Sequence, residues 1–342
     1  MRALVYADLQ ADLSSELLFS DPTQSLRLHC VKKFYAELSS LCAEHACDAV
    51  YDLGDTFDDR NALDYPSLNA VIGGLKGLKV KGPNFRIIGN HDQFQKDGSV
   101  HNGCVLERFF HTVADRQIQA IGDCMAFFVS YPADHAELTE WLLKEVKRFR
   151  GPKILFGHFQ AKGAFYKGGT ALTGIPLEAL APFNLVLLGH IHLPQSLSDR
   201  IHYVGSPFQQ DWGEAQQTKR VGIVDTNTMT VEWVPLKGYP EYRSVDLAAF
   251  KQQAQAGDEH RYRVTLNSQT EAEQFFALPN CNRAVARYNY TETSEAAEQA
   301  ENHDWSFEGT CRRYLKTVPP NKVGIDMSDD DMIAISAQML SR

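Results

Sequence analysis

Five short polar clusters contain residue types that bind metal ions, and at least four of them directly follow an apolar run. Their side chains offer carboxylate, amide and imidazole donors but no thiolate. Mixed oxygen and nitrogen donors suit Mn²⁺, Fe²⁺ or Zn²⁺ better than Ca²⁺. The clusters therefore predict a metal site assembled from several loops. They are Asp8-Leu9-Gln10, Gly54-Asp55-Thr56-Phe57-Asp58, Gly89-Asn90-His91-Asp92, Gly157-His158 and Gly189-His190-Ile191-His192.

Each cluster taken alone also has an ordinary structural interpretation. A single Gly-Asp pair after a strand is more often a turn than a metal ligand, and Asn90-His91 in isolation is a turn as well. His190 and His192 alternate along an extended chain, so their side chains could face opposite ways. Five clusters in sequence order at successive strand ends are much harder to explain as turns, and their combination favours a shared metal site.

The elements that must position these clusters alternate between strand and helix patterns over the first 235 residues. Helical periods cover residues 26–41 and 138–149. Such alternation predicts a layered α/β core, in which ligands bind beyond the carboxyl ends of the strands. A closing β-meander is expected at residues 201–204, 221–225 and 231–235. The strands that precede the clusters are predicted at residues 3–7, 49–53, 85–88, 153–156 and 184–188.

The sequence pattern changes after residue 235. A strand at residues 261–266, a helix at 270–278 and a strand at 283–290 predict a small α+β domain spanning residues 236–300. The tail, residues 301–342, has a capping-box pattern at Ser328 and Asp331, which predicts an amphipathic helix over residues 328–340. We therefore expect a core domain of residues 1–235, a small domain and a C-terminal tail.

Composition limits the classes of function. The net charge is −9, from 34 Lys and Arg against 43 Asp and Glu, whereas proteins that hold nucleic acid by phosphate neutralisation alone are usually basic. If the chain handles nucleic acid, metal ions or a partner must supply positive charge. No apolar run approaches the length of a membrane span. Seven cysteines without a CxxC pair, and no signal-peptide layout, predict a reducing compartment, the cytoplasm.

The series D-x-(H/Q), GDxxD, GNHD, GH and GHxH, from Asp8 to His192, resembles the calcineurin-like metallophosphoesterase superfamily. The resemblance implies an α/β four-layer sandwich, with helices flanking two central β-sheets, and a small α+β capping domain. It also implies two divalent metal ions that share Asp55. One metal would be bound by Asp8, Gln10, Asp55 and His192, and the other by Asp55, Asn90, His158 and His190. His91, oriented by Asp58, would stabilise the leaving group as a catalytic residue.

One residue departs from the superfamily's pattern. The first motif usually ends in histidine, and here that position is Gln10. An amide oxygen can bind a hard cation but is a weaker donor than imidazole. We therefore expect looser binding of that metal, with Mn²⁺ as the first choice, Mg²⁺ as the second and Zn²⁺ disfavoured.

Three segments after the last motif resemble the SbcD-type DNA nucleases, including the phage recombination versions. They are Tyr203-Val204-Gly205-Ser206-Pro207, Trp212-Gly213-Glu214 and Lys219-Arg220-Val221-Gly222. The resemblance implies a nuclease subunit that acts on DNA ends or hairpins, forms a homodimer and works with an SbcC-type ATPase of the SMC-like class. Residues 236–300 would then cap the DNA, the tail would dock the ATPase, and Tyr166 and Lys167 are candidate DNA contacts.

Other members of the superfamily fit less well. Protein phosphatases read GDxxDR and GNHE, whereas here Asp occupies position 59, Arg60 comes one place late and Asp92 ends the third motif. A phosphodiesterase for small nucleotides or other diesters keeps the same metal site without DNA or ATPase, and remains the alternative. A non-catalytic scaffold is a third hypothesis, which only Gln10 supports.

Overall fold

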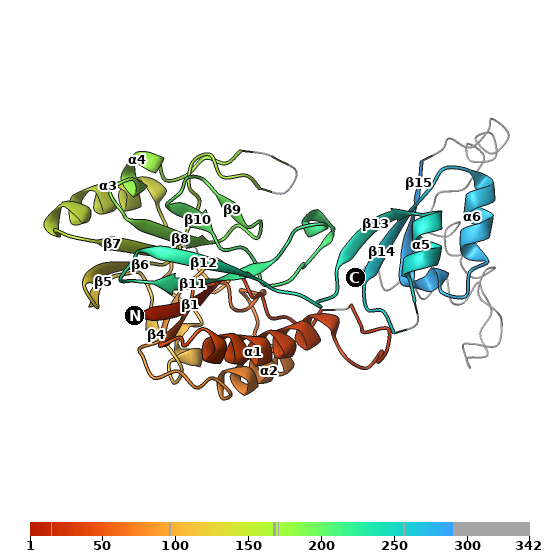
Figure 1. The fold of residues 1–342 in the computed structure, drawn as a ribbon, viewed down its shortest axis with the longest axis horizontal. Coiled ribbons are helices and arrows are strands. Elements are labelled where there is room, and N and C mark those ends of the chain that lie inside the picture. The colour runs from red at the N-terminus through yellow and green to blue at the C-terminus, as the bar shows by residue number, and fades with distance from the viewer. Residues whose placement is uncertain (15, 96, 167–168, 170, 256, 290–342) are drawn as a thin grey trace, which may run out of the picture. The chain divides into compact units, whose positions relative to one another are not determined.

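The computed structural model describes residues 1–14, 16–95, 97–166, 169, 171–255 and 257–289 (Figure 1). Contacts between Cα atoms divide the chain into two compact units. The first contains Met1–Thr265 and Leu278–Ala286; the second contains Leu266–Ala277 and begins again at Arg287. The expected division into residues 1–235, 236–300 and 301–342 stays a prediction. The helix expected at residues 328–340 lies outside the described residues.

The first large sheet has the strand order β12–β11–β1–β2–β3–β4. Strands β1 to β4 run parallel, while β11 is antiparallel to β1 and β12 to β11. The six strands are β1 (Arg2–Tyr6), β2 (Ala49–Asp52), β3 (Phe85–Ile87), β4 (His111–Val113), β11 (Arg220–Asp225) and β12 (Thr230–Pro235).

The second large sheet has the order β5–β6–β7–β8–β10–β9. Its four central strands run parallel, and the outer strands β5 and β9 are antiparallel to their neighbours. The strands are β5 (Arg116–Ile121), β6 (Cys124–Val129), β7 (Lys153–His158), β8 (Leu185–Gly189), β9 (Gln195–Ser196) and β10 (Ile201–Tyr203).

Four helices cover the outer faces of the two sheets. Helices α1 and α2 share an apolar cluster with the first sheet, and α3 and α4 share another with the second sheet. Three short 3₁₀ turns, η1, η2 and η4, lie in the connections. The bounds are α1 (Leu26–Glu44), α2 (Tyr65–Leu75), η1 (Gly103–Leu106), α3 (His135–Glu145), η2 (Val146–Arg148), α4 (Leu177–Leu180) and η4 (Trp212–Glu214).

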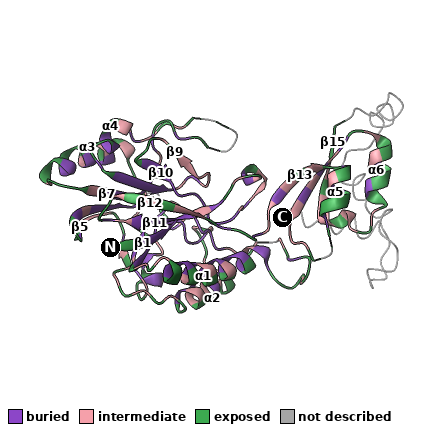
Figure 2. Cartoon of the chain, in the orientation of Figure 1, coloured by how far each residue is buried: buried purple, intermediate pink, exposed green. Residues whose placement is uncertain are grey.

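A third apolar cluster lies between the two sheets. Successive side chains of a strand point to opposite faces, so Tyr6 packs in the outer cluster with α1 whereas Val5 packs between the sheets. There the Phe85 ring from the first sheet stacks on Phe128 from the second, with ring centroids 4.2 Å apart. In Figure 2 the central strand β7 of the second sheet is coloured as buried. The layers therefore run helix, sheet, sheet, helix, which confirms the predicted fold class.

The strand at residues 201–204 does not belong to a closing β-meander, so that prediction is wrong. Strand β10 pairs parallel with β8 in the second sheet, whereas β11 and β12 form an antiparallel pair in the first sheet. An alternating or apolar run identifies a strand but not its partner. The connection between β10 and β11 passes from one sheet to the other, and it carries the Gly205-Ser206-Pro207 and Trp212-Gly213-Glu214 segments.

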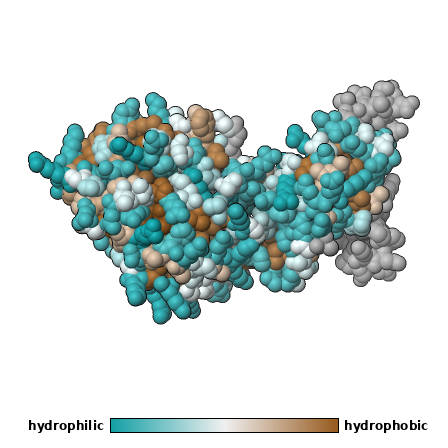
Figure 3. Space-filling view, viewed as in Figure 1, coloured by the Kyte–Doolittle hydropathy of each residue, from teal (hydrophilic) through white to brown (hydrophobic). Residues whose placement is uncertain are grey.

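A third, three-stranded sheet follows β12, with the order β13–β14–β15 and with β13 parallel to β14. Its elements are β13 (Tyr242–Asp246), α5 (Leu247–Gln253), β14 (Arg261–Leu266), α6 (Gln269–Phe276), η5 (Cys281–Arg283) and β15 (Ala284–Tyr288). The strands and the helix expected from the sequence here are present. The face of the sandwich in Figure 3 mixes apolar and polar side chains. None of the described helices is long and apolar enough to span a membrane.

Candidate metal centre

The predicted ligands lie at the carboxyl ends of five parallel strands that belong to both large sheets. Asp8 follows β1, Asp55 follows β2 and Asn90 follows β3 in the first sheet; His158 ends β7 and His190 follows β8 in the second. The backbone amide of His190 donates to both carboxylate oxygens of Asp8, at 3.0 and 3.1 Å. This contact joins the two sheets at the edge where their loops meet.

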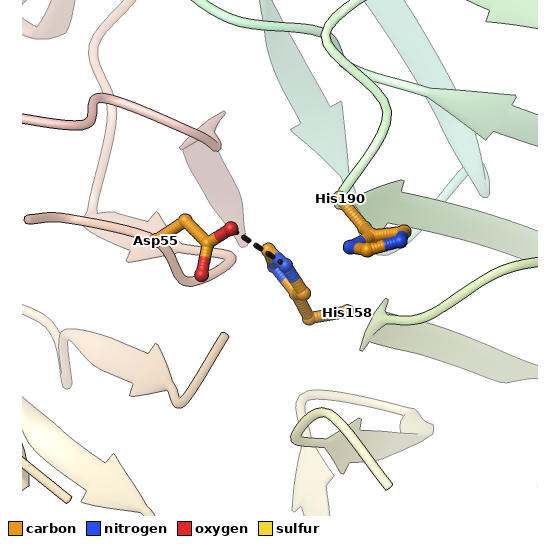
Figure 4. A group of neighbouring side chains, drawn as sticks. All are labelled: Asp55, His158 and His190. Carbon is orange, nitrogen blue, oxygen red and sulfur yellow. Dashed lines mark ion pairs between the residues drawn. The ribbon is translucent and has the colours of Figure 1, made fainter. Parts of the chain in front are cut away.

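Asp55, His158 and His190 form the tightest group of ligand atoms in the described part of the chain. Their candidate ligand atoms all lie within 4.8 Å of one another. His158 stands between the other two side chains (Figure 4), with its Nε2 atom 3.2 Å from Asp55 Oδ2. Asn90 Oδ1 lies 3.3 Å from His158 Nε2 and 2.6 Å from His190 Nδ1. The structure therefore brings together all four members of the second predicted ligand set.

The side chains of the first predicted ligand set lie farther apart than those of the second. His192 Nε2 lies 4.0 Å from Asp8 Oδ1. The backbone amide of Gln10 donates to the carbonyl oxygen of Asp55 at 2.9 Å, and Gln10 is buried. Asp8 and Asp55 are also buried, so this side of the centre collects two carboxylates in a space shielded from water. Such buried charges are stable only when a cation or hydrogen bonds compensate for them.

Hydrogen bonds from outside the ligand set fix two of the imidazole rings. His158 Nδ1 lies 2.6 Å from the carbonyl oxygen of Leu53, so Nδ1 donates there and Nε2 is the ring nitrogen that faces Asp55. His192 Nδ1 lies 2.7 Å from Glu214 Oε1, which leaves its Nε2 atom facing Asp8. A histidine whose second nitrogen is held in this way is typical of metal ligands.

Glu214 is a residue that the sequence analysis did not assign to the site. It is fully buried, and Lys219 Nζ lies 2.8 Å from its second oxygen. Burial would raise the pKa of Glu214, but its bond to His192 and the charge of Lys219 lower that pKa well below its usual value. Ser206 also donates to Glu214, at 3.2 Å. The three segments noted after the last motif thus meet in one network behind His192.

Asp92 is a second residue whose role was missed. Its Oδ2 atom accepts from the backbone amides of Asp55, at 2.8 Å, and Gly89, at 3.1 Å. Its Oδ1 atom accepts from the fully buried Arg86 at 2.7 Å. Asp92 therefore joins the loop after β2, which carries the shared aspartate, to the loop after β3.

Several site residues have a left-handed backbone that side chains rarely adopt. The φ angles are 55° for Asp8, 46° for Gln10, 54° for Asp55 and 83° for His190. Each such residue costs on the order of 1–3 kcal/mol, and strain of this kind concentrates at functional sites. Gly89 approaches the site closely as well, since a Cβ there would lie 2.5 Å from Asp55 N and overlap Asp55 Oδ1.

His91 and Asp58 lie at the rim of the centre. His91 Nδ1 lies 2.6 Å from the carbonyl oxygen of Asp58 and 3.4 Å from its carboxylate oxygen Oδ1. The His91 side chain is 34% exposed, unlike the buried His158. Its backbone amide donates to Asp55 Oδ1 at 2.8 Å. His91 is therefore attached to the shared aspartate through its backbone, while its ring is accessible from outside.

Burial and charge shift the pKa values of the buried ligands. Burial raises the pKa of Asp8 to about 6, although the charges of His158 and His192 oppose this. Burial alone would lower the pKa of His158, but the charge of Asp55 raises it to about 9. Burial and the charge of His158 lower the pKa of His190 to about 3. In the metal-free protein His158 therefore carries the proton that offsets Asp55, and metal binding there is expected to release it.

The two candidate DNA contacts differ in what the structure describes. Tyr166 is 45% exposed and lies in the loop between β7 and α4. Lys167 lies outside the described residues. A DNA contact at Tyr166 or Lys167 stays a prediction.

Comparisons with known proteins give two sequence relatives. The chain is 29% identical over 221 residues to "Putative phosphoesterase 078R" of Invertebrate iridescent virus 3, covering 62% of this chain and 63% of that protein. It is 23% identical over 187 residues to "Exonuclease subunit 1" of Enterobacteria phage T4, covering 53% of this chain and 54% of that protein. The chain thus spans less than two thirds of the length of either relative.

No family model matches the chain. Among solved structures, the calcineurin-like phosphoesterase YfkN from Bacillus subtilis is similar with a TM-score of 0.36 and 11% identity, covering 69% of this chain and 88% of that chain.

Proposed function

We propose that this chain is a calcineurin-like metallophosphoesterase and, more specifically, a metal-dependent nuclease that hydrolyses phosphodiester bonds of DNA. The observation that carries the proposal is the position of Asp55. Its carboxylate lies 3.2 Å from His158 on one side, and its loop is joined to the Asp8 and Gln10 loop on the other. Asp55 is therefore placed to serve two neighbouring ligand sets.

The residues at the centre fit two divalent cations. Asp8, Gln10, Asp55 and His192 would hold one cation, and Asp55, Asn90, His158 and His190 would hold the other. Oxygen and imidazole donors without thiolate suit Mn²⁺, and the amide of Gln10 weighs against Zn²⁺. When bound, a pair of cations activates water and neutralises charge on a phosphodiester.

His91 is the residue proposed to act on the leaving group. Its Nδ1 atom donates to the carbonyl oxygen of Asp58, which leaves Nε2 of the exposed ring for the departing oxygen. When protonated, the ring can donate a proton there and remove the negative charge that develops as the bond breaks. Asp58 orients the ring, since its carboxylate oxygen Oδ1 lies 3.4 Å from His91 Nδ1.

The proposal includes partners. The phage T4 relative is named as one subunit of an exonuclease, which supports a multi-subunit nuclease. We propose that this chain forms a homodimer and works with an SbcC-type ATPase on DNA ends or hairpins in the cytoplasm. The net charge of −9 agrees with a partner that shares the binding of DNA.

The test is cleavage of end-labelled linear duplex DNA in Mn²⁺ by the wild type and by His91→Ala. The wild type is expected to cut, and His91→Ala to be slower by about a hundredfold to ten-thousandfold, the usual contribution of a general acid. Metal uptake by the variant, measured by calorimetry, should stay near the wild-type value. Equal loss of cleavage and metal uptake would contradict the role of His91.

An aryl phosphodiester is the matched substrate for this test. Hydrolysis of the aryl diester without any cutting of DNA, even when the ATPase partner is added, would refute the nuclease proposal and favour a phosphodiesterase of small molecules. Failure to take up metal or to hydrolyse either substrate would refute the proposal that this chain is a metal-dependent hydrolase.

A further inference from the structure

A pocket of about 270 Å³ opens directly beside the metal centre, and none of the assigned roles uses it. Asn90, a proposed metal ligand, forms part of its wall. The other residues that matter here are Arg60, Gln93, Tyr131 and His135. Since Asn90 borders both spaces, a substrate with its phosphodiester at the metals can extend a neighbouring group into this pocket.

Arg60 supplies the pocket with a positive charge. Its side chain is half-buried, and its guanidinium forms no hydrogen bond or ion pair with the described residues. Burial and the charge of Asp55 raise the pKa of the Tyr131 hydroxyl, and the charge of Arg60 opposes them. A guanidinium without a carboxylate partner, next to a metal centre, is suited to bind a phosphate.

Tyr131 gives the pocket a fixed aromatic wall. The backbone amide of Tyr131 donates to the carbonyl oxygen of Ile88 at 2.8 Å, and the side chain of Gln93 donates to the carbonyl oxygen of Tyr131 at 3.0 Å. The Tyr131 ring lies 5.3 Å from the ring of His190 and 5.9 Å from that of His135. These contacts hold the ring between the metal ligand and the far wall, where it can pack against a sugar or base.

His135 offers a free polar atom. Its Nε2 atom is buried and has no hydrogen-bond partner among the described residues. Burial lowers the pKa of His135, so the ring is neutral near pH 7. A buried polar atom without a partner is unfavourable unless a ligand or water pairs with it. His135 lines the pocket, and a turn of its ring would expose Nε2 for a neutral hydrogen bond to a nucleoside.

We infer that this pocket is the subsite for a single unpaired nucleotide adjacent to the scissile phosphate, with Arg60 on its phosphate and Tyr131 and His135 on its nucleoside. The inference rests on the proposed nuclease function, because it assumes a nucleic-acid strand as substrate. A space of about 270 Å³ lies just below the range of small-ligand sites, so it suits one nucleotide better than a base pair. We therefore expect the strand to be unpaired where it enters.

The experiment measures binding of thymidine 5′-monophosphate to the Mn²⁺-loaded full chain by calorimetry, for the wild type and for Arg60→Gln. Loss of a charged hydrogen bond to phosphate is expected to weaken binding by about tenfold or more. Thymidine without phosphate should bind both proteins equally. Tyr131→Leu should weaken binding of the monophosphate more than binding of inorganic phosphate.

Arg108→Gln is the matched control, because Arg108 is exposed and lines a separate pocket with Gly82 and Pro83. It should bind the monophosphate as the wild type does and keep the basal turnover of an aryl diester. Equal affinity of the wild type and Arg60→Gln would overturn the subsite, and so would equal weakening by Arg60→Gln and Arg108→Gln. Unfolding curves of both variants identify a loss that comes from misfolding.

The subsite and the nuclease proposal fail in different ways. If the wild type cuts no DNA even with the ATPase partner, but Arg60→Gln still loses affinity for the monophosphate, the nuclease proposal fails and the pocket stands only as a nucleotide site. If DNA is cut but Arg60→Gln binds the monophosphate normally, the nuclease proposal stands and the subsite fails. A duplex with an unpaired terminal nucleotide should also be cut faster than a fully paired one; equal rates would contradict entry of an unpaired strand.

Discussion

Glu214 Oε1 lies 2.7 Å from His192 Nδ1, and this contact directs the opposite nitrogen of the ring toward Asp8, 4.0 Å away. The carboxylate is fully buried, and Lys219 neutralises it from the other side. A carboxylate behind a metal-binding histidine fixes the ring and increases its basicity. Glu214 is therefore a positioning residue for one of the two proposed metals.

Glu214→Gln is expected to lower the affinity for one metal by about tenfold to a hundredfold and to leave the affinity for the other nearly unchanged. Glutamine can still accept from His192, but it removes the negative charge and leaves Lys219 without its counter-charge. Calorimetric titration with Mn²⁺ measures the two affinities separately. Glu145→Gln serves as control, since Glu145 is also buried but pairs with Arg148 in α3 and η2. Equal weakening of both metals would show that Glu214 supports the fold rather than His192.

Gln10→His is expected to raise the affinity for the same metal without changing the fold. Imidazole is a stronger donor than an amide oxygen toward Mn²⁺ or Zn²⁺. The left-handed backbone of Gln10, with φ of 46°, is one that histidine adopts more readily than most residues do. The measurement is metal affinity for Mn²⁺ and Zn²⁺, with a larger gain expected for Zn²⁺. Unchanged affinity for both ions would count against Gln10 as a ligand.

Gly89→Ala is expected to destabilise the protein by roughly 1–3 kcal/mol, as other overpacked sites do. The added Cβ would overlap Asp55 Oδ1 and crowd Asp55 N, so the shared aspartate must move and metal affinity should fall as well. Urea unfolding in a chelator gives the stability, and calorimetry gives the metal affinity.

Gly73→Ala is the control for this substitution. Gly73 lies inside α2, and a Cβ there meets no atom within 4 Å. Alanine in a helix interior is more stable than glycine by roughly 0.5–1 kcal/mol, so this variant should gain stability and keep its metal affinity. A Gly89→Ala protein as stable as Gly73→Ala would show that the loop around Gly89 can open without strain.

The sequence predicted that these polar side chains would meet, because each follows a strand that its own local pattern reveals. The apolar runs before Asp8, Asp55 and His158 are short, and parallel strands bring their carboxyl ends to one edge. Strand identity therefore indicated that these side chains lie together, whereas their roles as metal ligands came from the family resemblance and stay a prediction. The alternation of strands and helices predicted a layered α/β core, and the four-layer arrangement came from the same resemblance.

The supporting residues could not be predicted in this way, because their partners are distant in sequence. Glu214 lies 22 residues after His192, in a connection that passes between the sheets, and its role depends on that path. Arg86 lies inside β3 as a charged residue in an apolar strand, which is explained only by Asp92 and Asp52 in the folded protein. The wrong partner for β10 has the same origin, since register and sheet membership are tertiary properties.

Asp8→Asn is expected to stabilise the metal-free protein increasingly as the pH rises. A carboxyl whose pKa is higher in the folded chain stabilises the fold at low pH, and that contribution is lost as the pH rises through the folded pKa. For Asp8 the interval runs from its ordinary value of 3.8 to about 6, because burial outweighs the charges of His158 and His192. Asparagine stays neutral and can still accept from the amide of His190, so it avoids this loss.

The stability difference between Asp8→Asn and the wild type should therefore grow by up to about 3 kcal/mol between about pH 4 and pH 7, at about 1.4 kcal/mol per pKa unit. Urea unfolding in a chelator across this range measures it. Saturating Mn²⁺ should reverse the order, because the wild type then gains binding energy that the variant lacks. A difference that stays constant with pH would show that Asp8 is ionised throughout, and that water or the neighbouring histidines compensate its charge without a metal.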